Sequence, residues 1–223
     1  MRGSLGVVVG YLRFLERPET LTRDQRSHLE SISKACGRLN ELIEQMSILS
    51  KIEEGKLKFE RVRAINLRPI LAQAVSALPE LADRDVRVTL ATGEGAATLK
   101  GDSTYLTSAF AALFDALRRE LVTSNELQIR ERLRSTQSGN ESWIVVGPAE
   151  LVAALESATA EQLDTFDEWR GGTGMRLPIA RRVIEAHGGR VWQRVEELEQ
   201  DLDTTDVRLK IKKKAAVVML PIH

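Results

Sequence analysis

A narrow apolar stripe constrains the N-terminal part of the chain more than any other feature. Its members recur at steps of three and four residues: Leu29, Ile32, Cys36, Leu39, Ile43 and Met46. This heptad-like spacing places them along one side of a helix, where partner helices cover them. The stripe therefore predicts a long helix that belongs to a helical bundle.

A shorter helix is expected before the long one. Its apolar residues also keep to one side, and they are Leu5, Val8, Val9, Leu12 and Leu15. Pro18 ends this helix, because proline and the residue before it disfavour the helical conformation. Thr22 and Gln25 have the spacing of a capping box, which marks the start of the long helix. We expect a helical hairpin over residues 5–54.

Two helices of such unequal length cannot bury both stripes by themselves. The hairpin is therefore predicted to dimerise into a four-helix bundle. The predicted dimer seam consists of Leu5, Val9, Leu12, Leu29, Ile32, Cys36, Leu39, Ile43 and Met46. The alternative is that the hairpin packs on the second domain of its own chain.

The hydrophobic pattern changes after Gly55, a residue suited to a left-handed helix end. Strands are expected near residues 57–62, 86–90, 127–133, 142–146, 189–192, 207–212 and 216–220, and helices near 67–78, 106–121, 151–163 and 177–186. Helices mixed with mostly hairpin-connected strands predict a two-layer α/β sandwich. The fold class is therefore α+β, with a helical hairpin in residues 1–60 and the sandwich in residues 61–223.

Composition argues against several classes of partner. The 223 residues carry 32 basic and 32 acidic side chains, so there is no basic excess to attract nucleic acid or an anionic membrane. Aromatic residues make up only 4% of the chain, which argues against base-stacking surfaces. No apolar run approaches the roughly 18 residues that could cross a bilayer. We expect neither nucleic-acid binding nor membrane insertion.

Cysteine usage and the start of the sequence indicate a compartment. The single Cys36 cannot form an internal disulfide, and the first residues lack a signal-peptide layout. Both features are typical of a protein of the reducing cytoplasm. No group of His, Cys, Asp and Glu has the spacing of metal ligands, so no metal site is predicted.

The most specific motif is the run WRGGTGMRLPIARRVIEAHGGRVW over residues 169–192. Glycines where a loop meets a helix let backbone amides approach phosphate groups, and the N-terminus of the helix adds a favourable potential. The run resembles the glycine-rich lid end, the following helix and the Glu-Ala-His-Gly-Gly turn of sensor histidine kinases. Their ATPase-like domain is shared with Hsp90, gyrase and MutL.

Weaker similarities follow in the same order along the chain. Residues 66–71 resemble the first helix of that ATPase-like domain, residues 101–116 resemble the segment through its nucleotide-site helix, and residues 219–221 resemble its last strand. Residues 2–12 and the long helix resemble the dimerisation and histidine-phosphotransfer hairpin. The resemblance implies a transmitter core with a response-regulator-like partner.

The phosphate acceptor departs from the family pattern. In the family the accepting His lies just before a Leu-Arg-x-Pro-Leu run, and that position falls two residues before Met1 here. The expected nucleophile is therefore absent from this chain. Either it lies upstream of Met1 or the protein lacks it.

The nucleotide-site helix departs as well. In the family it carries an Asn that helps hold Mg²⁺ against the phosphates, and residues 111–116 contain none. Asp115 is the nearest substitute, since a carboxylate can ligate Mg²⁺ but also repels phosphate. In an ungapped alignment the position falls on Ala116, which ligates nothing.

Two further departures affect the base and the lid. The family's Asp-x-Gly-x-Gly, whose Asp accepts a hydrogen bond from the adenine amino group, corresponds to residues 147–150, which contain no Asp. Arg176 replaces the last glycine of the lid end, where it contacts phosphate or, as we expect, fills the cavity. The candidate nucleotide-site residues are Asp115, Gly171, Gly172, Thr173, Gly174, Met175 and Arg176. ATP and Mg²⁺ are expected only if this site still functions.

Other conspicuous residues have simpler interpretations. His28 lies off the apolar stripe and is expected at the surface, and His187 is expected to meet free carbonyls at a helix end. Cys36 is expected to pack as a small apolar residue. The charge cluster at residues 210–214 is expected to be a solvated strand face.

Three functions remain open. The favoured one is a degenerate histidine-kinase-like transmitter core, a homodimer without catalysis that binds a response-regulator-like protein around Leu12, Leu15 and Leu29. The second is an active ATP-dependent sensor histidine kinase whose phosphoacceptor His lies upstream of Met1. The third is an ATP-independent histidine phosphotransferase. No catalytic residue is assigned, and whether the chain is an enzyme stays open.

Overall fold

The computed structural model describes residues 2–15, 21–91, 97–122, 124–136, 139–170, 174–201 and 208–222. The chain divides into two compact units, unit 1 (Met1–Lys56) and unit 2 (Leu57–His223). The domain ranges expected from the sequence, 1–60 and 61–223, divide the chain at nearly the same place. Their roles as a dimerisation hairpin and an ATPase-like domain stay predictions.

Unit 1 is a pair of helices, α1 (Arg2–Leu15) and α2 (Arg23–Glu53). Thr22 caps α2: its hydroxyl accepts from the Gln25 backbone N–H at 3.2 Å, and the Gln25 side chain accepts from the Thr22 backbone N–H at 3.0 Å. Beyond the other end, Gly55 has a φ of 65°, a left-handed conformation that glycine adopts without steric cost. Local sequence thus sets both ends of α2.

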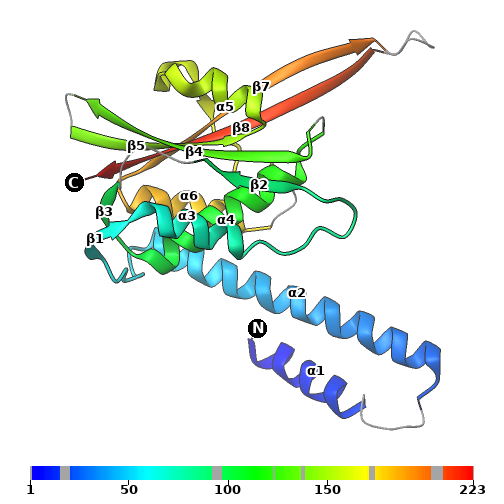
Figure 1. The fold of residues 1–223 in the computed structure, drawn as a ribbon. Helices are drawn as coiled ribbons and strands as arrows, with labels where there is room; N and C mark the ends of the chain where they lie inside the picture. Colours follow the sequence, from blue (N-terminus) through cyan, green and yellow to red (C-terminus); the bar gives the residue numbers. More distant parts are fainter. Residues whose placement is uncertain are drawn as a thin grey trace. The chain divides into compact units, whose positions relative to one another are not determined.

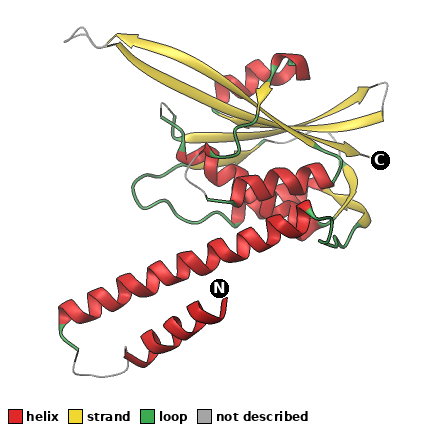
Figure 2. Cartoon of the chain, turned by 180° about the vertical axis from the view of Figure 1, so that it is seen from behind, coloured by secondary structure: helices red, strands yellow, loops and turns green. Residues whose placement is uncertain are grey.

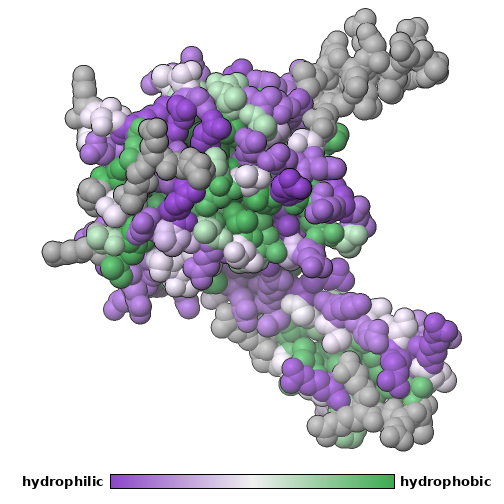
Figure 3. All heavy atoms as spheres, viewed as in Figure 1, coloured by the Kyte–Doolittle hydropathy of each residue, from purple (hydrophilic) through white to green (hydrophobic). Residues whose placement is uncertain are grey.

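The apolar stripe of α2 is divided between two environments. Cys36 of α2 is only 6% exposed, as is Leu12 of α1. In contrast, Ile32, Leu39 and Met46 of α2 are 46%, 52% and 56% exposed. The other members of the predicted seam are half-buried, and they are Leu5, Val9, Leu29 and Ile43. Figure 3 shows apolar residues at the surface of this unit. The hairpin therefore buries part of its apolar surface and leaves another part open along α2.

Unit 2 is built on a mixed sheet with the strand order β2-β4-β5-β8-β7-β6 (Figure 1). Its strands are β2 (Arg87–Leu90), β4 (Glu126–Thr136), β5 (Gly139–Gly147), β6 (Asp164–Thr165), β7 (Arg190–Asp201) and β8 (Arg208–Ile222). β2 is parallel to β4, and the other pairs are antiparallel. A separate antiparallel pair joins β1 (Val62–Asn66) to β3 (Thr98–Gly101). β3 and β6 have no counterpart among the predicted strands.

Helices α3 (Leu67–Ser76), α4 (Ser103–Arg119) and α6 (Arg176–Ala186) cover one face of the large sheet (Figures 1 and 2). The core between these layers contains several of the largest fully buried side chains, among them Phe110, Phe114, Leu67, Leu127 and Ile144. The α+β fold class and the helix-on-sheet sandwich are thereby confirmed.

The opposite face of the sheet carries a smaller layer (Figure 2). It consists of α5 (Ala149–Ala154) and two single turns, Leu155–Ser157 and Ala160–Gln162. Its core includes Trp143, Val145, Leu151, Val152, Leu155, Ala158, Ala215 and Val217. Because neighbouring strand residues point to opposite faces, β5 serves this core and the helical core in alternation. The chain thus passes to the other face directly after β5.

Strands β7 and β8 form a long hairpin that extends past the neighbouring strands. They pair as far as Asp201 and Arg208, whereas β6 pairs with β7 only at Trp192 and Gln193 and the pairing of β5 with β8 stops at Ala216. The two strands predicted at 207–212 and 216–220 are one strand, β8. The strand continues between them because β7 pairs with β8 across the whole interval.

The lysines of β8 correct a prediction. We expected residues 210–214 to form a solvated face, but Lys213 and Lys214 are half-buried. Lys213 pairs with Glu150 of α5, and the Nζ of Lys214 lies 3.2 Å from Glu120 at the end of α4. Consecutive strand residues reach opposite faces of the sheet, so each lysine contacts a different layer. Lys212 is exposed and pairs with Glu197 across the hairpin at 2.8 Å.

Candidate functional site

Helices α4 and α6 pack against each other, and a groove of about 310 Å³ lies between them and the end of α3. Most of the residues that line this α4–α6 groove are small or apolar, such as Ala112 and Ile179. Asp115 and Arg176 are the charged residues in its wall. Two of the predicted site residues, distant in sequence, therefore share one groove.

The ends of α4 are fixed by side chains. At its N-terminus the Asp102 carboxylate accepts from the backbone N–H groups of Thr104 and Tyr105 at 3.0 and 3.2 Å, which satisfies donors that the helix itself cannot. Beyond its C-terminus Arg84 donates to the carbonyl oxygens of Arg119 and Leu121. The position of the groove wall is thus set at both ends of the helix.

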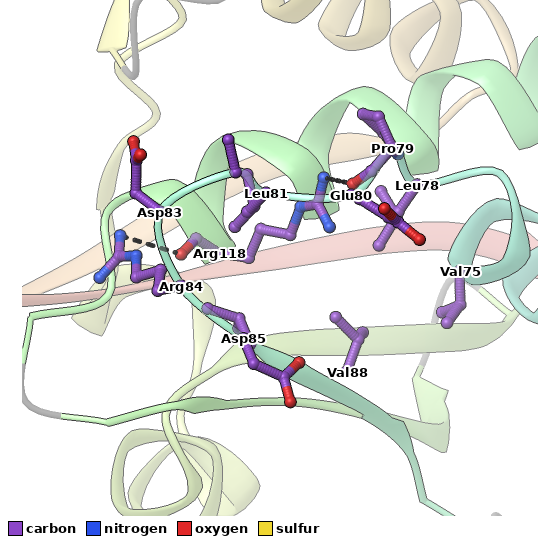
Figure 4. Close-up of a pocket in the computed structure, with 12 residues that line it drawn as sticks. Val75, Leu78, Pro79, Glu80, Leu81, Asp83, Arg84, Asp85, Val88 and Arg118 are labelled. Atoms are coloured by element: carbon purple, nitrogen blue, oxygen red, sulfur yellow. Dashed lines mark hydrogen bonds between the residues drawn. The ribbon is translucent and has the colours of Figure 1, made fainter.

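Asp115 is only 4% exposed, and both of its carboxylate oxygens face arginines of its own helix. Arg118 places Nη2 and Nε 2.6 and 2.9 Å from Oδ1, and Arg119 places Nε 3.0 Å from Oδ2. Arg118, itself 5% exposed, also donates to the carbonyl oxygen of Pro79 (Figure 4). The carboxylate is therefore paired with two guanidinium groups, and Arg118 links α4 to the loop that follows α3.

These contacts do not fit a Mg²⁺ site. Mg²⁺ needs oxygen ligands that can enter a near-octahedral shell, but each oxygen of Asp115 already holds a guanidinium group. Ala116, the other aligned position, is fully buried. Within the described part of the chain, no group of three or more His, Cys, Asp and Glu residues could hold a metal ion.

The structure describes part of the predicted lid end. Gly174 has a φ of 63°, and the half-buried Met175 is the N-cap residue of α6. Arg176 is the first residue of α6 and is exposed. Gly171, Gly172 and Thr173 lie outside the described residues. Of the predicted residues, the structure brings Asp115 and Arg176 to the groove and places Gly174 and Met175 just before α6.

The end of β5 supplies no polar anchor for a base. Gly147 packs so closely on Ala215 that a Cβ on the glycine would lie 2.7 Å from the Ala215 Cβ. Pro148 then leads into α5, which lies on the opposite face of the sheet from α4 and α6 (Figure 1). Residues 148–157 are thus separated from the α4–α6 groove by the sheet.

A buried charged network lies beyond the end of α4, and the sequence interpretation missed it. Arg170 is 5% exposed, and its Nε lies 3.1 Å from one oxygen of Glu120, whose other oxygen lies 3.2 Å from Lys214. Arg170 also donates to Gln193 at 2.8 Å. Burial lowers the pKa of Arg170, and the charge of Glu120 partly offsets this. These residues meet only in the folded chain, so no local pattern marks them.

His187 at the end of α6 is also buried. The backbone N–H of Asp102 donates to its Nε2 at 3.0 Å, so the proton lies on Nδ1, which donates to the carbonyl oxygen of Val183 at 2.7 Å. Burial lowers the pKa of His187, and the positive charge of Arg61 lowers it further. Both ring nitrogens are engaged, so this histidine is structural. His28 is exposed, as the sequence predicts.

The order of these parts defines a class of protein. A helical hairpin is followed by an α/β sandwich in which a glycine-containing junction opens the helix beside the groove. This is the architecture of the transmitter core of sensor histidine kinases, as the sequence motifs imply. In the described part of the chain, no helix combines the length and the apolar character needed to span a bilayer.

Sequence comparisons agree with this class. No family model matches the chain. The sensor protein GacS of Pseudomonas syringae pv. syringae is 27% identical over 206 residues, which are 86% of this chain and 22% of GacS. The circadian input-output histidine kinase CikA of Synechococcus elongatus is 29% identical over 208 residues, which are 86% of this chain and 26% of CikA. The chain therefore spans only a small share of the length of these relatives.

Solved structures share the fold. Full-length ShkA in complex with AMPPNP superimposes with a TM-score of 0.68 at 15% identity, over 99% of this chain and 43% of ShkA. The histidine kinase AdeS of Acinetobacter baumannii superimposes with a TM-score of 0.56 at 14% identity, over 98% of this chain and 95% of the AdeS chain. The chain thus has the fold of a histidine kinase transmitter core, and its sequence relatives are sensor histidine kinases.

Proposed function

We propose that this chain is a degenerate histidine-kinase-like transmitter core, which acts in two-component signalling by binding a protein partner and not by transferring phosphate from ATP. The observation that carries this proposal is the state of Asp115. Of the described residues that line the α4–α6 groove, it alone is acidic, and Arg118 and Arg119 occupy both of its oxygens. A Mg²⁺ ion would have to displace them.

The energetic cost of that displacement supports the proposal. Removing one partner of a buried ion pair costs about 3–5 kcal/mol, since the other charge stays buried and unpaired. A base amino group without an acceptor costs about 1–3 kcal/mol more. The sum, at least about 4 kcal/mol, corresponds to a loss of roughly a thousandfold in nucleotide affinity.

The open face of unit 1 supports a homodimer. Ile32, Leu39 and Met46 lie along one side of α2 and are about half exposed, although apolar stripes of this kind are usually covered by partner helices. We propose that a second copy covers them in a four-helix bundle. Within the predicted seam, Leu12 and Cys36 are already buried in the single chain.

The partner surface is proposed on α1. Leu12 is buried and cannot contribute, but Tyr11, Phe14 and Leu15 are 67%, 68% and 49% exposed. Exposed aromatic side chains are typical anchors of protein interfaces. A response-regulator-like protein is the partner that the family resemblance implies.

Calorimetric titration with AMPPNP tests the absence of nucleotide chemistry. We expect no Mg²⁺-dependent heat from this chain at millimolar nucleotide, and ShkA, whose structure contains AMPPNP, serves as the positive control. A Mg²⁺-dependent dissociation constant tighter than about 100 μM, equivalent to roughly −5.5 kcal/mol, would overturn the proposal. It would support an active kinase whose acceptor His lies outside this chain.

Light scattering at micromolar concentration tests the dimer. We expect a dimer for the natural chain and a monomer for Leu39→Asp, which buries a charge in the proposed seam. Lys34→Asp, which places the same residue on another side of α2, is the matched control and stays dimeric. A strictly monomeric natural chain contradicts this part of the proposal.

A further inference from the structure

Three successive residues at the start of unit 2 are held by the ends of α4 and α6. The ring of Phe59 packs edge-on against Tyr105 of α4 and against His187 after α6, with ring centroids 5.2 and 5.0 Å away. The backbone N–H of Glu60 donates to Oδ2 of Asp102 at 2.8 Å. We call Phe59, Glu60, Arg61, Asp102 and His187 the clasp.

Arg61 completes the clasp at the other helix. Its Nη2 donates to the carbonyl oxygen of Ala186 at 2.8 Å, where α6 ends, and its guanidinium lies 5.7 Å from the ring centroid of Phe59. A carbonyl at the end of a helix has no partner within the helix. Residues 59–61 are therefore bonded to the first turn of α4 and to the last turn of α6.

The buried polar groups of the clasp have few alternative partners. Asp102 and His187 are each 6% exposed, and the backbone N–H of Asp102 donates to the ring of His187. Separating them would leave buried polar groups unpaired, which is unfavourable. The close approach also depends on Gly101, where a Cβ would lie 2.8 Å from Cδ2 of His187.

Two residues that contact the clasp also line the α4–α6 groove. Tyr105 lines the groove, packs on Phe59 and donates its backbone N–H to Asp102. Val183 also lines the groove, and its carbonyl oxygen accepts from His187. A displacement of residues 59–61 therefore acts on one groove residue from each helix.

We propose that the clasp couples the position of residues 59–61, which follow α2 within a few residues along the chain, to the width of the α4–α6 groove. Pulling this segment away removes the support of Tyr105 and Val183 and opens the groove. Because coupling between two sites is reciprocal, an occupant that widens the groove releases residues 59–61. The coupling does not depend on what the groove binds, so it stands apart from the proposed function.

Thiol reactivity in the full chain tests the coupling. In a Cys36→Ser background, Ala112→Cys places a reporter in the groove wall, and Ala153→Cys places a control reporter on α5 across the sheet. We expect Phe59→Ala to accelerate the reaction of Cys at position 112 by about fivefold or more, the lower end of typical coupling between sites. Lys58→Ala, a change of the exposed neighbour, is the matched control and leaves the rate unchanged.

The outcomes separate coupling from general loosening. If Phe59→Ala has no more effect than Lys58→Ala, or accelerates both reporters equally, the proposal is overturned. Should Phe59→Ala not fold, Phe59→Leu keeps apolar volume but loses the edge-on ring contacts, and we expect a smaller acceleration at position 112 only. No acceleration in Phe59→Leu would overturn the proposal as well.

The reverse direction has its own measurement. Attaching a bulky thiol reagent at position 112 fills the groove, and we expect faster hydrogen exchange at the backbone amides of Glu60 and Asp102 than in the unmodified protein. The same reagent at position 153 is the control. Equal exchange in the modified and unmodified proteins would contradict the reciprocity that the proposal requires.

Discussion

Two aspartates of the α4 segment are equally buried but hold different partners. Asp102, 6% exposed, accepts hydrogen bonds from the backbone N–H groups of Glu60, Thr104 and Tyr105. Asp115, 4% exposed, holds two guanidinium groups. The partners of a carboxylate, and not its burial, decide its role: backbone amides make Asp102 a capping residue, whereas two guanidinium groups occupy Asp115 and close it to a metal ion.

Removing the carboxylate of Asp115 should destabilise the chain more than any other change considered below. Asp115→Ala leaves Arg118 buried without its partner, so we expect a loss of about 3–5 kcal/mol in the free energy of unfolding. Urea denaturation measures it. Asp85→Ala, at an exposed position in the loop after α3, is the control and is expected to change stability by no more than about 0.5 kcal/mol.

Asp102→Ala tests the amide-bound carboxylate. It removes the cap of α4 and leaves the Glu60 amide without its acceptor, so we expect a loss of about 1–3 kcal/mol. Asp102→Asn keeps one acceptor oxygen and should lose less than the alanine variant in the same denaturation experiment. Equal losses in the two variants would show that the accepted hydrogen bonds are not what Asp102 contributes.

His187, which accepts a hydrogen bond from the backbone N–H of Asp102, should make the free energy of unfolding depend on pH. Burial lowers the pKa of His187 below its ordinary value of 6.5, so the unfolded chain binds this proton more readily than the folded one. The stabilising contribution is complete above about pH 6.5 and is lost as the pH falls through the folded pKa. Unfolding free energies between about pH 7.5 and 5 should therefore fall less steeply in His187→Gln than in the natural chain, and an unchanged slope would contradict this assignment.

The two arginines that pair with Asp115 should contribute unequally to stability. The side chain of Arg119 is 43% exposed, whereas that of Arg118 is 6% exposed. An exposed ion pair contributes about 0–1 kcal/mol, so Arg119→Ala should cost no more than that in urea denaturation. Arg118→Ala should cost several times as much. Similar losses in the two variants would show that Arg118 is not the main stabilising partner of Asp115.

Local signals predicted the parts of the fold that depend on neighbours in sequence. Thr22, Gln25 and Gly55 mark the ends of α2 through contacts within a few residues. The ion pairs of Asp115 could also have been predicted, because arginines three and four residues later lie on the same side of a helix. The face of the sheet on which α5 lies could not be predicted. It depends on which residues of β5 point to each face, and this is set only when the sheet forms.

The long hairpin of β7 and β8 presents strand edges at which copies of this chain could associate. In the part of the hairpin beyond β5 and β6 that the structure describes, each strand has only the other as a neighbour. Open strand edges can template aggregation, and charged side chains, lysine above all, discourage it. Glu197 lies opposite Lys212 and pairs with it at 2.8 Å, so charged side chains both join the two strands here and discourage pairing with another molecule.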